Sequence, residues 1–361
     1  MKKVRGFFFI FLGFLWSSPL WGAQAPAPWG PMDAIEGAAR KEGKLVIYSA
    51  PGHVSTDGQR EIGEFFKSRY GITIDWTTMS ARDLSPRVIA EQTTRQYVAD
   101  IGMSGLEGNY VELKPRGYVV PILAPSTLEK NVWRLDPATA IPKDRDWLYI
   151  KLPLQPGLFV NTNMIKPGEE PKSYKDLLDP KWKGKILLQI PWSGGTGSGW
   201  FRGTYRALGL DYMKALAKQV VLVPQVNDSA DQVARGQYPV SVGASILRGP
   251  QLMAEGAPVK FIPPKEGYYL SVNGVEFIVN APHPNAAKFF LNWFFTREGQ
   301  MIYAKSSLAI SVRKDVPQDY LPQDQRYVEG APIMMSLPED FTVERNKELA
   351  QLARDIFEGG R

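Results

Sequence analysis

The residue pattern with the clearest chemical potential is a glycine-rich run at 193–200, Ser-Gly-Gly-Thr-Gly-Ser-Gly-Trp, which precedes a stretch of helical periodicity. Glycines let a backbone approach a ligand closely. The first N–H groups of a helix lack intrahelical acceptors and carry a partial positive charge, so this run favours an anion or a polar head group. The alternative is a packing loop without a ligand. Trp192 and Trp200 would then belong to the core rather than stack on a ligand.

Spacing excludes three familiar motifs in this run. A dinucleotide-binding G-x-G-x-x-G motif would need glycine where Trp200 or Arg202 stands. A P-loop would need lysine directly after its last glycine, and Trp200 occupies that position. A G-x-S-x-G nucleophile elbow would need glycine at Pro191 or Thr196. The nucleotide-binding and serine-hydrolase interpretations therefore fail.

The sequence offers few residues for metal binding and none for thiol chemistry. The chain has two histidines and no cysteine. His53 lies in a turn after a predicted strand, His283 lies between two prolines, and no H-E-x-x-H spacing is present. Acidic residues are plentiful, but spacing singles out no carboxylate pair, so a secreted hydrolase stays a distant alternative. We expect that the protein is not an enzyme and that it has no catalytic residue, no metal ligand and no cofactor.

Composition and the amino-terminal residues bear on the compartment. The 361 residues carry a net charge of +6, and three of the positive charges lie within the first five positions. An apolar stretch at 7–16 follows, about half the roughly 20 residues of a spanning helix, with small residues near 22–25. We interpret 1–25 as a signal peptide for export to the periplasm, an uncleaved anchor being the alternative. The small remaining charge excess, without a basic run, argues against nucleic acid.

The first part of the chain alternates helices and strands as parallel sheets require. The predicted helices lie at 32–41, 58–70 and 84–97, and the predicted strands at 45–48, 72–76 and 98–103.

A second unit repeats this alternation after a long extended stretch at 148–161, which is broken by Pro153 and Pro156 and suits a crossing between lobes. In this unit we expect strands at 185–190, 220–223 and 240–242 and helices at 199–208, 212–219 and 229–234. The last third of the chain differs from it, with strands expected at 259–262, 268–272 and 275–279 and helices at 285–295 and 343–357. The chain shows no internal repeat with a period of 20–50 residues.

Four segments carry a resemblance to a known family: 41–49, 90–92 with 99–101, 173–184 and 285–300. The most specific is the run Asp-Leu-Leu-Asp-Pro-Lys-Trp-Lys-Gly that ends at Gly184. Together they resemble the periplasmic substrate-binding proteins of ABC transporters, most of all the ferric-binding-protein-like group of extracellular solute-binding family 1.

The resemblance implies an α/β, type II periplasmic binding protein fold, with two α/β lobes joined by crossing strands at a hinge. It divides the chain into the signal peptide, a first part of lobe 1 at 26–125, lobe 2 at 126–267 and a second part of lobe 1 at 268–361. The site would lie between the lobes. Lobe 1 would contribute Ser49, His53, Ser80 and Ser104. Lobe 2 would contribute Ser193, Gly194, Gly195, Thr196, Asn227, Asp228 and Ser245. Further candidates are Arg82, Trp192 and Arg248.

The sequence departs from the ferric-binding pattern at one decisive place. Ferric-binding members present two adjacent tyrosines after the strand that corresponds to 240–242, whereas this chain has Ile246 and Leu247. Tyr268 and Tyr269 are adjacent, but as alternating strand residues they would point to opposite faces. The expected function is therefore capture of a small anionic solute, such as a phosphonate, sugar phosphate or carboxylate, for delivery to an inner-membrane ABC permease. A monomer is expected, and ferric iron binding is the alternative.

Overall fold

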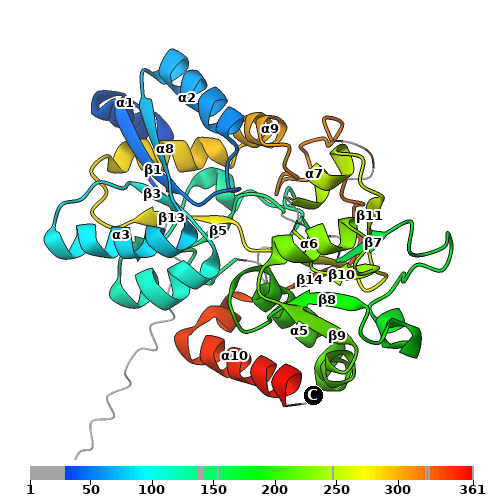
Figure 1. Cartoon of the computed structure of the whole chain (residues 1–361). Coiled ribbons are helices and arrows are strands. Elements are labelled where there is room, and N and C mark those ends of the chain that lie inside the picture. Colours follow the sequence, from blue (N-terminus) through cyan, green and yellow to red (C-terminus); the bar gives the residue numbers. More distant parts are fainter. Residues whose placement is uncertain are drawn as a thin grey trace, which may run out of the picture.

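The chain folds around two β-sheets that lie side by side, each flanked by helices (Figure 1). The computed structural model describes residues 29–136, 141–152, 154–155, 157–245, 248–321, 323 and 326–359. The predicted signal peptide, Pro153, Pro156, Ile246 and Leu247 lie outside these residues. No helix of the described part is both long enough and apolar enough to cross a bilayer.

The first sheet has the order β2-β1-β3-β13-β4, and β5 also pairs with β13. Its strands are β1 (Lys44–Ser49), β2 (Thr73–Thr78), β3 (Ile101–Met103), β4 (Val119–Val120), β5 (Leu148–Tyr149) and β13 (Gly274–Ile278). Strands β1, β2 and β3 are parallel, and β13 runs antiparallel to β3. Both faces are buried, because Leu45 and Ile47 join one apolar cluster while Val46 and Tyr48 join another.

Helices cover both faces of this sheet. They are α1 (Met32–Glu42), α2 (Thr56–Tyr70), α3 (Ala81–Thr94), α8 (Pro284–Phe294) and α9 (Arg297–Ser306). Gly43 and Gly71 end α1 and α2 in the left-handed conformation, as the sequence predicts. Phe66 of α2 packs against Phe290 and Trp293 of α8 in the larger cluster.

The second sheet has the order β11-β7-β10-β8-β9. Its strands are β7 (Leu158–Asn161), β8 (Ile186–Gln189), β9 (Val220–Val223), β10 (Val240–Val242) and β11 (Val259–Ile262), and its helices are α5 (Gly195–Ala217), α6 (Val226–Ala234) and α7 (Arg248–Ala254). Helix α5 packs on one face through Trp200 and Phe201, whereas α6 packs on the other through Ala230 and Val233. At Gly209 the backbone of α5 kinks, where the sequence suggests two helices.

Two strands cross between the lobes and pair with each other. These are β6 (Leu154–Gln155) and β12 (Tyr268–Leu270), which run antiparallel, and β14 (Ile333–Met335) pairs with β12 on its other side. Short helical segments complete the fold at Gly108–Leu113, Lys114–Arg116, Pro125–Leu128, Lys175–Leu178, Pro180–Trp182 and Pro338–Phe341. The type II, two-lobed α/β architecture predicted from the sequence is confirmed.

The packing of two segments differs from the predicted division. Trp147 and Tyr149, expected in lobe 2, belong to the core of the first lobe, and β5 pairs with β13. The carboxyl-terminal helix α10 (Val343–Glu358), expected in lobe 1, packs against α5 in the core of the second lobe. Apolar periodicity shows that a segment is buried without showing which of two cores accepts it, so sequence could not decide either case.

Candidate functional site

The predicted residues of the first lobe follow the carboxyl ends of three neighbouring parallel strands. Ser49 ends β1, Ser80 and Arg82 follow β2, and Ser104 follows β3, in a sheet with the local order β2-β1-β3. In open α/β sheets, ligands bind at the carboxyl ends of the strands. The sheet topology therefore brings these residues to one edge.

The second lobe repeats this arrangement. The run 193–196 follows β8, Asn227 and Asp228 follow β9, and Ser245 follows β10, where β10, β8 and β9 are adjacent and parallel. All the predicted residues of this lobe thus lie at the carboxyl edge of its sheet.

Two hydrogen bonds through α10 connect the segment after β3 with helix α5. Glu107, three residues after Ser104, accepts a hydrogen bond from Asn346 Nδ2 of α10 at 3.2 Å. Asn346 Oδ1 in turn accepts a hydrogen bond from the guanidinium of Arg202, which lies in the first half of α5. The segment that follows β3 is therefore linked through α10 to the first half of α5.

The amino-terminal end of α5 has the features of an anion-binding loop. Gly194 and Gly195 have φ of 80° and 68°, values that favour glycine; Gly194 immediately precedes α5, and Gly195 is its first residue. The N–H of Gly197 donates to Gln189 Oε1 at 2.8 Å. Ser193 is exposed, and its Oγ donates to the carbonyl of Ile190 at 2.9 Å. The remaining N–H groups of this first turn, at Gly195 and Thr196, have no acceptor within the helix.

Asn227 and Asp228 are both exposed in the first turn of α6. The Asp228 carboxylate already places a negative charge at this helix end, so the α6 terminus is less favourable to an anion than that of α5.

Arg248 has its charge engaged within the lobe. Its guanidinium contacts Asp231 and Glu255, each at 2.9 Å, and these hydrogen bonds raise its pKa, that to Asp231 most. Its backbone N–H donates to Ser245 Oγ at 3.1 Å. Trp192 is half-buried against the second core, with the Arg354 guanidinium 5.9 Å above its ring. Arg82 is exposed.

The three serines of the first lobe donate their protons to nearby oxygens. Ser49 Oγ donates to the carbonyl of Ala50 at 3.3 Å, and Ser80 Oγ donates to Asp83 at 2.7 Å. Ser104 Oγ donates to Glu276 Oε1 at 2.8 Å. In this arrangement their hydroxyls could only accept a hydrogen bond from a ligand.

His53 is the most unusual of the predicted residues. Its side chain is buried at 5% exposure, and neither ring nitrogen has a hydrogen-bond partner in the described part of the chain. Burial, together with the positive charge of Lys151, lowers the pKa of His53 to about 4, so the ring is neutral at pH 7. The sequence gives no sign of Lys151, because its proximity to His53 depends on the pairing of β5 with β13.

Glu276 is a further residue that the sequence prediction missed, although a lone acid within the buried strand Gly-Val-Glu-Phe-Ile is a signal that could have found it. It is fully buried next to Gly102, where a Cβ would lie 2.6 Å from Glu276 Oε1. Burial raises the pKa of Glu276 to about 8, and the hydrogen bond from Ser104 opposes this only in part. The acid is therefore protonated at pH 7.

The described residues offer no cluster of three or more His, Asp or Glu side chains that could hold a metal ion. Tyr269 is buried against Gly199 of α5, whereas Tyr268 packs edge-on against Tyr327 with ring centroids 6.1 Å apart. The two phenols thus face different neighbours and form no metal-binding pair, as the strand alternation predicts.

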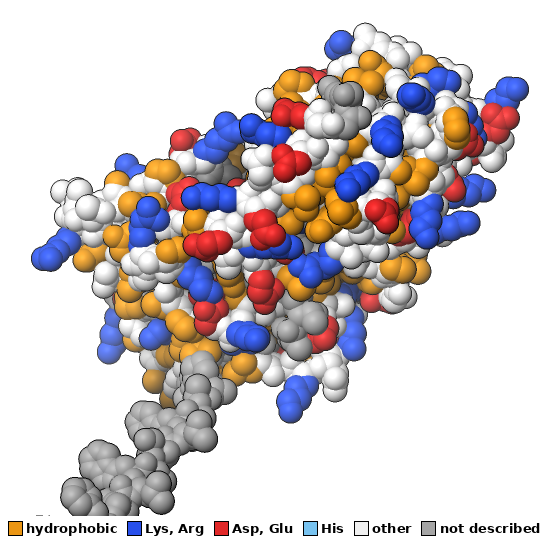
Figure 2. All heavy atoms as spheres, turned by 90° about the horizontal axis from the view of Figure 1, so that it is seen from below, with side chains coloured by type: hydrophobic (Ala, Val, Ile, Leu, Met, Phe, Trp, Pro, Cys, Tyr) orange, Lys and Arg blue, Asp and Glu red, His pale blue; other side chains and the backbone are white. Residues whose placement is uncertain are grey.

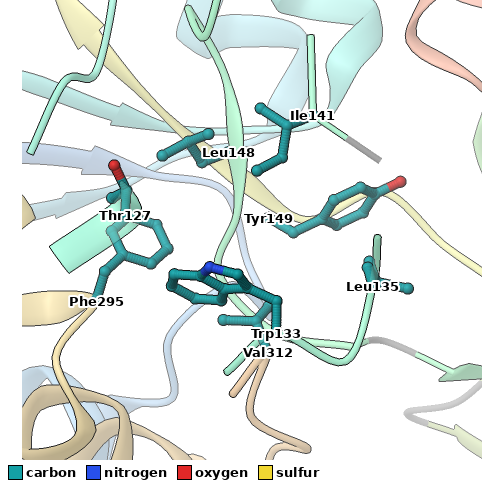
Figure 3. A pocket seen from close by; sticks show the side chains of 8 residues that line it. All are labelled: Thr127, Trp133, Leu135, Ile141, Leu148, Tyr149, Phe295 and Val312. Carbon is teal, nitrogen blue, oxygen red and sulfur yellow. The ribbon is translucent and has the colours of Figure 1, made fainter. Parts of the chain in front are cut away.

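Two cavities lie away from the predicted residues. One of about 30 Å³ is lined by apolar side chains of the first lobe, among them Trp133, Leu148 and Phe295 (Figure 3). The other, of about 470 Å³, lies beside β4 and β13 and is lined by residues such as Val120 and Phe277. Neither contains a residue of the predicted site. On the face seen in Figure 2, basic and acidic side chains are intermixed rather than gathered in a patch of one sign.

Comparison with known proteins adds a family match. The model of a family described as bacterial extracellular solute-binding protein matches residues 61–329. An uncharacterised protein of Haemophilus influenzae is 25% identical over 304 residues, which cover 80% of this chain and 83% of that protein.

Solved structures share the fold. The periplasmic binding protein AfuA of Actinobacillus pleuropneumoniae, with fructose-6-phosphate bound, is 20% identical with a TM-score of 0.65, over 87% of this chain and 98% of AfuA. Iron-bound HitA of Pseudomonas aeruginosa is 19% identical with a TM-score of 0.66, over 87% of this chain and 99% of HitA. At these identities the similarity concerns the fold.

Proposed function

The chain belongs to the bacterial extracellular solute-binding proteins, and from this premise we propose that it captures a small anionic solute between its lobes in the periplasm and delivers it to an inner-membrane ABC permease. Phosphonates, sugar phosphates and carboxylates are the candidate classes. The proposed mechanism is closure of the lobes around the solute, which shifts an open–closed equilibrium and breaks no covalent bond.

The observation that carries the proposal is the amino-terminal end of α5. Its first turn combines two left-handed glycines with exposed or half-buried positions at Ser193, Gly195 and Thr196. Backbone N–H groups and the helix dipole favour a negative group there, by up to about 2 kcal/mol in partly buried geometry. Asn227 follows the neighbouring strand β9 and could donate its amide to the same ligand.

A thermal-shift screen with phosphate, phosphonates, sugar phosphates and dicarboxylates tests the proposal, repeated with Thr196→Val and Asn227→Ala. We expect at least one anion to stabilise the wild-type protein and to stabilise Asn227→Ala less. Lys175→Ala, in the short helix Lys175–Leu178 of the same lobe, is the control and should respond as the wild type does. If none of these anions raises the melting temperature of the wild type, the proposed charge of the ligand is wrong.

Ferric iron is the competing ligand, because the solved structure of HitA is iron-bound and an iron uptake protein of Synechocystis is 26% identical over 176 residues. Against it stand the separated phenols of Tyr268 and Tyr269 and the cationic Lys151 beside His53. A phenolate–iron site would colour the loaded protein. A visible charge-transfer band after ferric loading, lost in Tyr269→Phe, would favour the iron alternative.

A further inference from the structure

Lys151 is a half-buried lysine that has no counter-ion within the described part of the chain. Its ammonium donates to the carbonyl of Gly52 and forms no ion pair with any described residue. Burial alone lowers the pKa of Lys151 to about 8, since no acidic side chain acts to raise it. Lys114 of the same lobe shows the usual arrangement, because Asp144 and Asp146 hold its ammonium at 2.7 and 3.0 Å.

The surroundings of Lys151 contain donors but no ionised acid. The nearby ring of His53 is neutral and has a free N–H to offer. The acid that lies beneath this edge, Glu276, is protonated at pH 7 and bonded to Ser104. No acidic side chain of the described residues therefore compensates the positive charge of Lys151 at this edge.

An uncompensated charge in a half-buried position costs free energy that a bound anion would recover. The position of Lys151 fits such a partner, because it follows β5 and reaches the turn that follows β1. Ser49 and Ser104 lie at the same edge, but their hydroxyl protons are donated to Ala50 and Glu276, so Lys151 and His53 supply the donors there. The Glu107–Asn346–Arg202 connection links this lobe to α5, the helix whose amino-terminal end is the other lobe's candidate anion-binding group.

We propose that Lys151, with the ring N–H of His53, is the first lobe's half of the ligand site and binds an acidic oxygen group of the solute. The solute then meets the ammonium on one side and the amide groups of α5 on the other, so it carries two negative charges, either on one phosphate group or on two carboxylates. This inference rests on the proposed function and narrows its substrate class. A Fe³⁺ ion beside Lys151 would be repelled.

The test is isothermal titration of the mature protein with glycerol 3-phosphate, succinate and acetate, using wild type, Lys151→Met and Lys151→Arg. The control is Lys44→Met, which removes a lysine paired with Asp75 at the opposite end of β1. We expect Lys151→Met to weaken binding of the preferred dianion about tenfold or more, equivalent to about 1.4 kcal/mol, while Lys151→Arg and Lys44→Met bind within about threefold of wild type. Glycerol 3-phosphate and succinate distinguish the two sources of the charge.

The melting temperature of each ligand-free variant separates binding from folding. Removal of an unpaired charge should leave the ligand-free Lys151→Met protein at least as stable as the wild type, whereas a purely structural lysine would lower its melting temperature. Equal affinity of wild type and Lys151→Met for a bound dianion overturns this inference and leaves the α5 anion site standing. Acetate binding as tightly as either dianion overturns the assignment of two charges. If no anion binds the wild type, the proposed function fails as well.

Discussion

Replacement of Glu276 by glutamine should stabilise the protein at neutral pH. Glu276 is fully buried in β13, and burial raises its pKa to about 8. In the unfolded chain the same carboxyl ionises near its usual 4.5. Between these two values the unfolded state releases a proton that the folded state keeps, so the free energy of unfolding falls as pH rises through this window.

The magnitude follows from the two pKa values. At pH 7 the difference from 4.5 corresponds to about 3 kcal/mol, and above pH 8 the cost levels off at about 5 kcal/mol. Glutamine cannot ionise, and its carbonyl oxygen can still accept the hydrogen bond that Ser104 Oγ gives to Glu276 Oε1. The substitution therefore removes the pH-dependent cost while the local contact is retained.

Urea unfolding at pH 4, 7 and 9 measures the effect. The stabilisation by Glu276→Gln should be near zero at pH 4 and grow through pH 7 to pH 9. Glu61→Gln, at an exposed position of α2, is the control and should show no such growth. A stability difference between Glu276→Gln and wild type that stays constant from pH 4 to pH 9 would refute the assignment of a raised pKa to Glu276.

Three further predictions concern the hinge contact, the buried histidine and a strained leucine. Gly199→Ala should lower the free energy of unfolding by about 1–3 kcal/mol in denaturant titrations, because the new Cβ would overlap the hydroxyl of buried Tyr269. Gly63→Ala in α2 is the control and should not lower it, because the new Cβ meets nothing within 4 Å. His53, with its pKa lowered to about 4, should cost the protein up to about 3 kcal/mol as pH falls from 6.5 to 4, since the unfolded state binds the proton first; His53→Gln should flatten the dependence of melting temperature on pH in that window. Leu308 is 66% exposed with φ of 46°, so Leu308→Gly should increase the free energy of unfolding by up to about 1 kcal/mol and raise the melting temperature slightly. An unchanged or lower melting temperature would show that the leucine side chain makes stabilising contacts.

Much of the local structure could be predicted from sequence, because it depends on neighbours along the chain. The apolar run of β1, the glycines that end α1 and α2, and the strands β9, β10 and β11 appear where their patterns predict them. The sequence did not indicate helix α9, although Thr296 caps it by accepting a hydrogen bond from Gly299 N at 3.1 Å. Its apolar face is too sparse to stand out beside the aromatic helix α8.

The candidate site divides in the same way. The glycine run before α5 could be recognised in the sequence, and the two glycines with positive φ, Gly194 and Gly195, lie within that run. Ser49, Ser80 and Ser104 could be placed at strand ends by resemblance, but their hydrogen bonds to Ala50, Asp83 and Glu276 could not. Whether these serines and the α5 loop bind one solute stays a prediction.

Patterns along the chain are enough to establish what kind of polypeptide this is: two runs of alternating strands and helices, a long extended crossing, and a glycine-rich loop that opens a helix. Folding in three dimensions was needed to place α10 in the second core and to set Lys151 beside His53, with no acidic partner among the residues that the structure describes. The difference comes from separation along the chain. Periodicity and turn chemistry act over a few residues, whereas the charge of Lys151 acts on His53, 98 residues earlier, only after β5 has paired with β13.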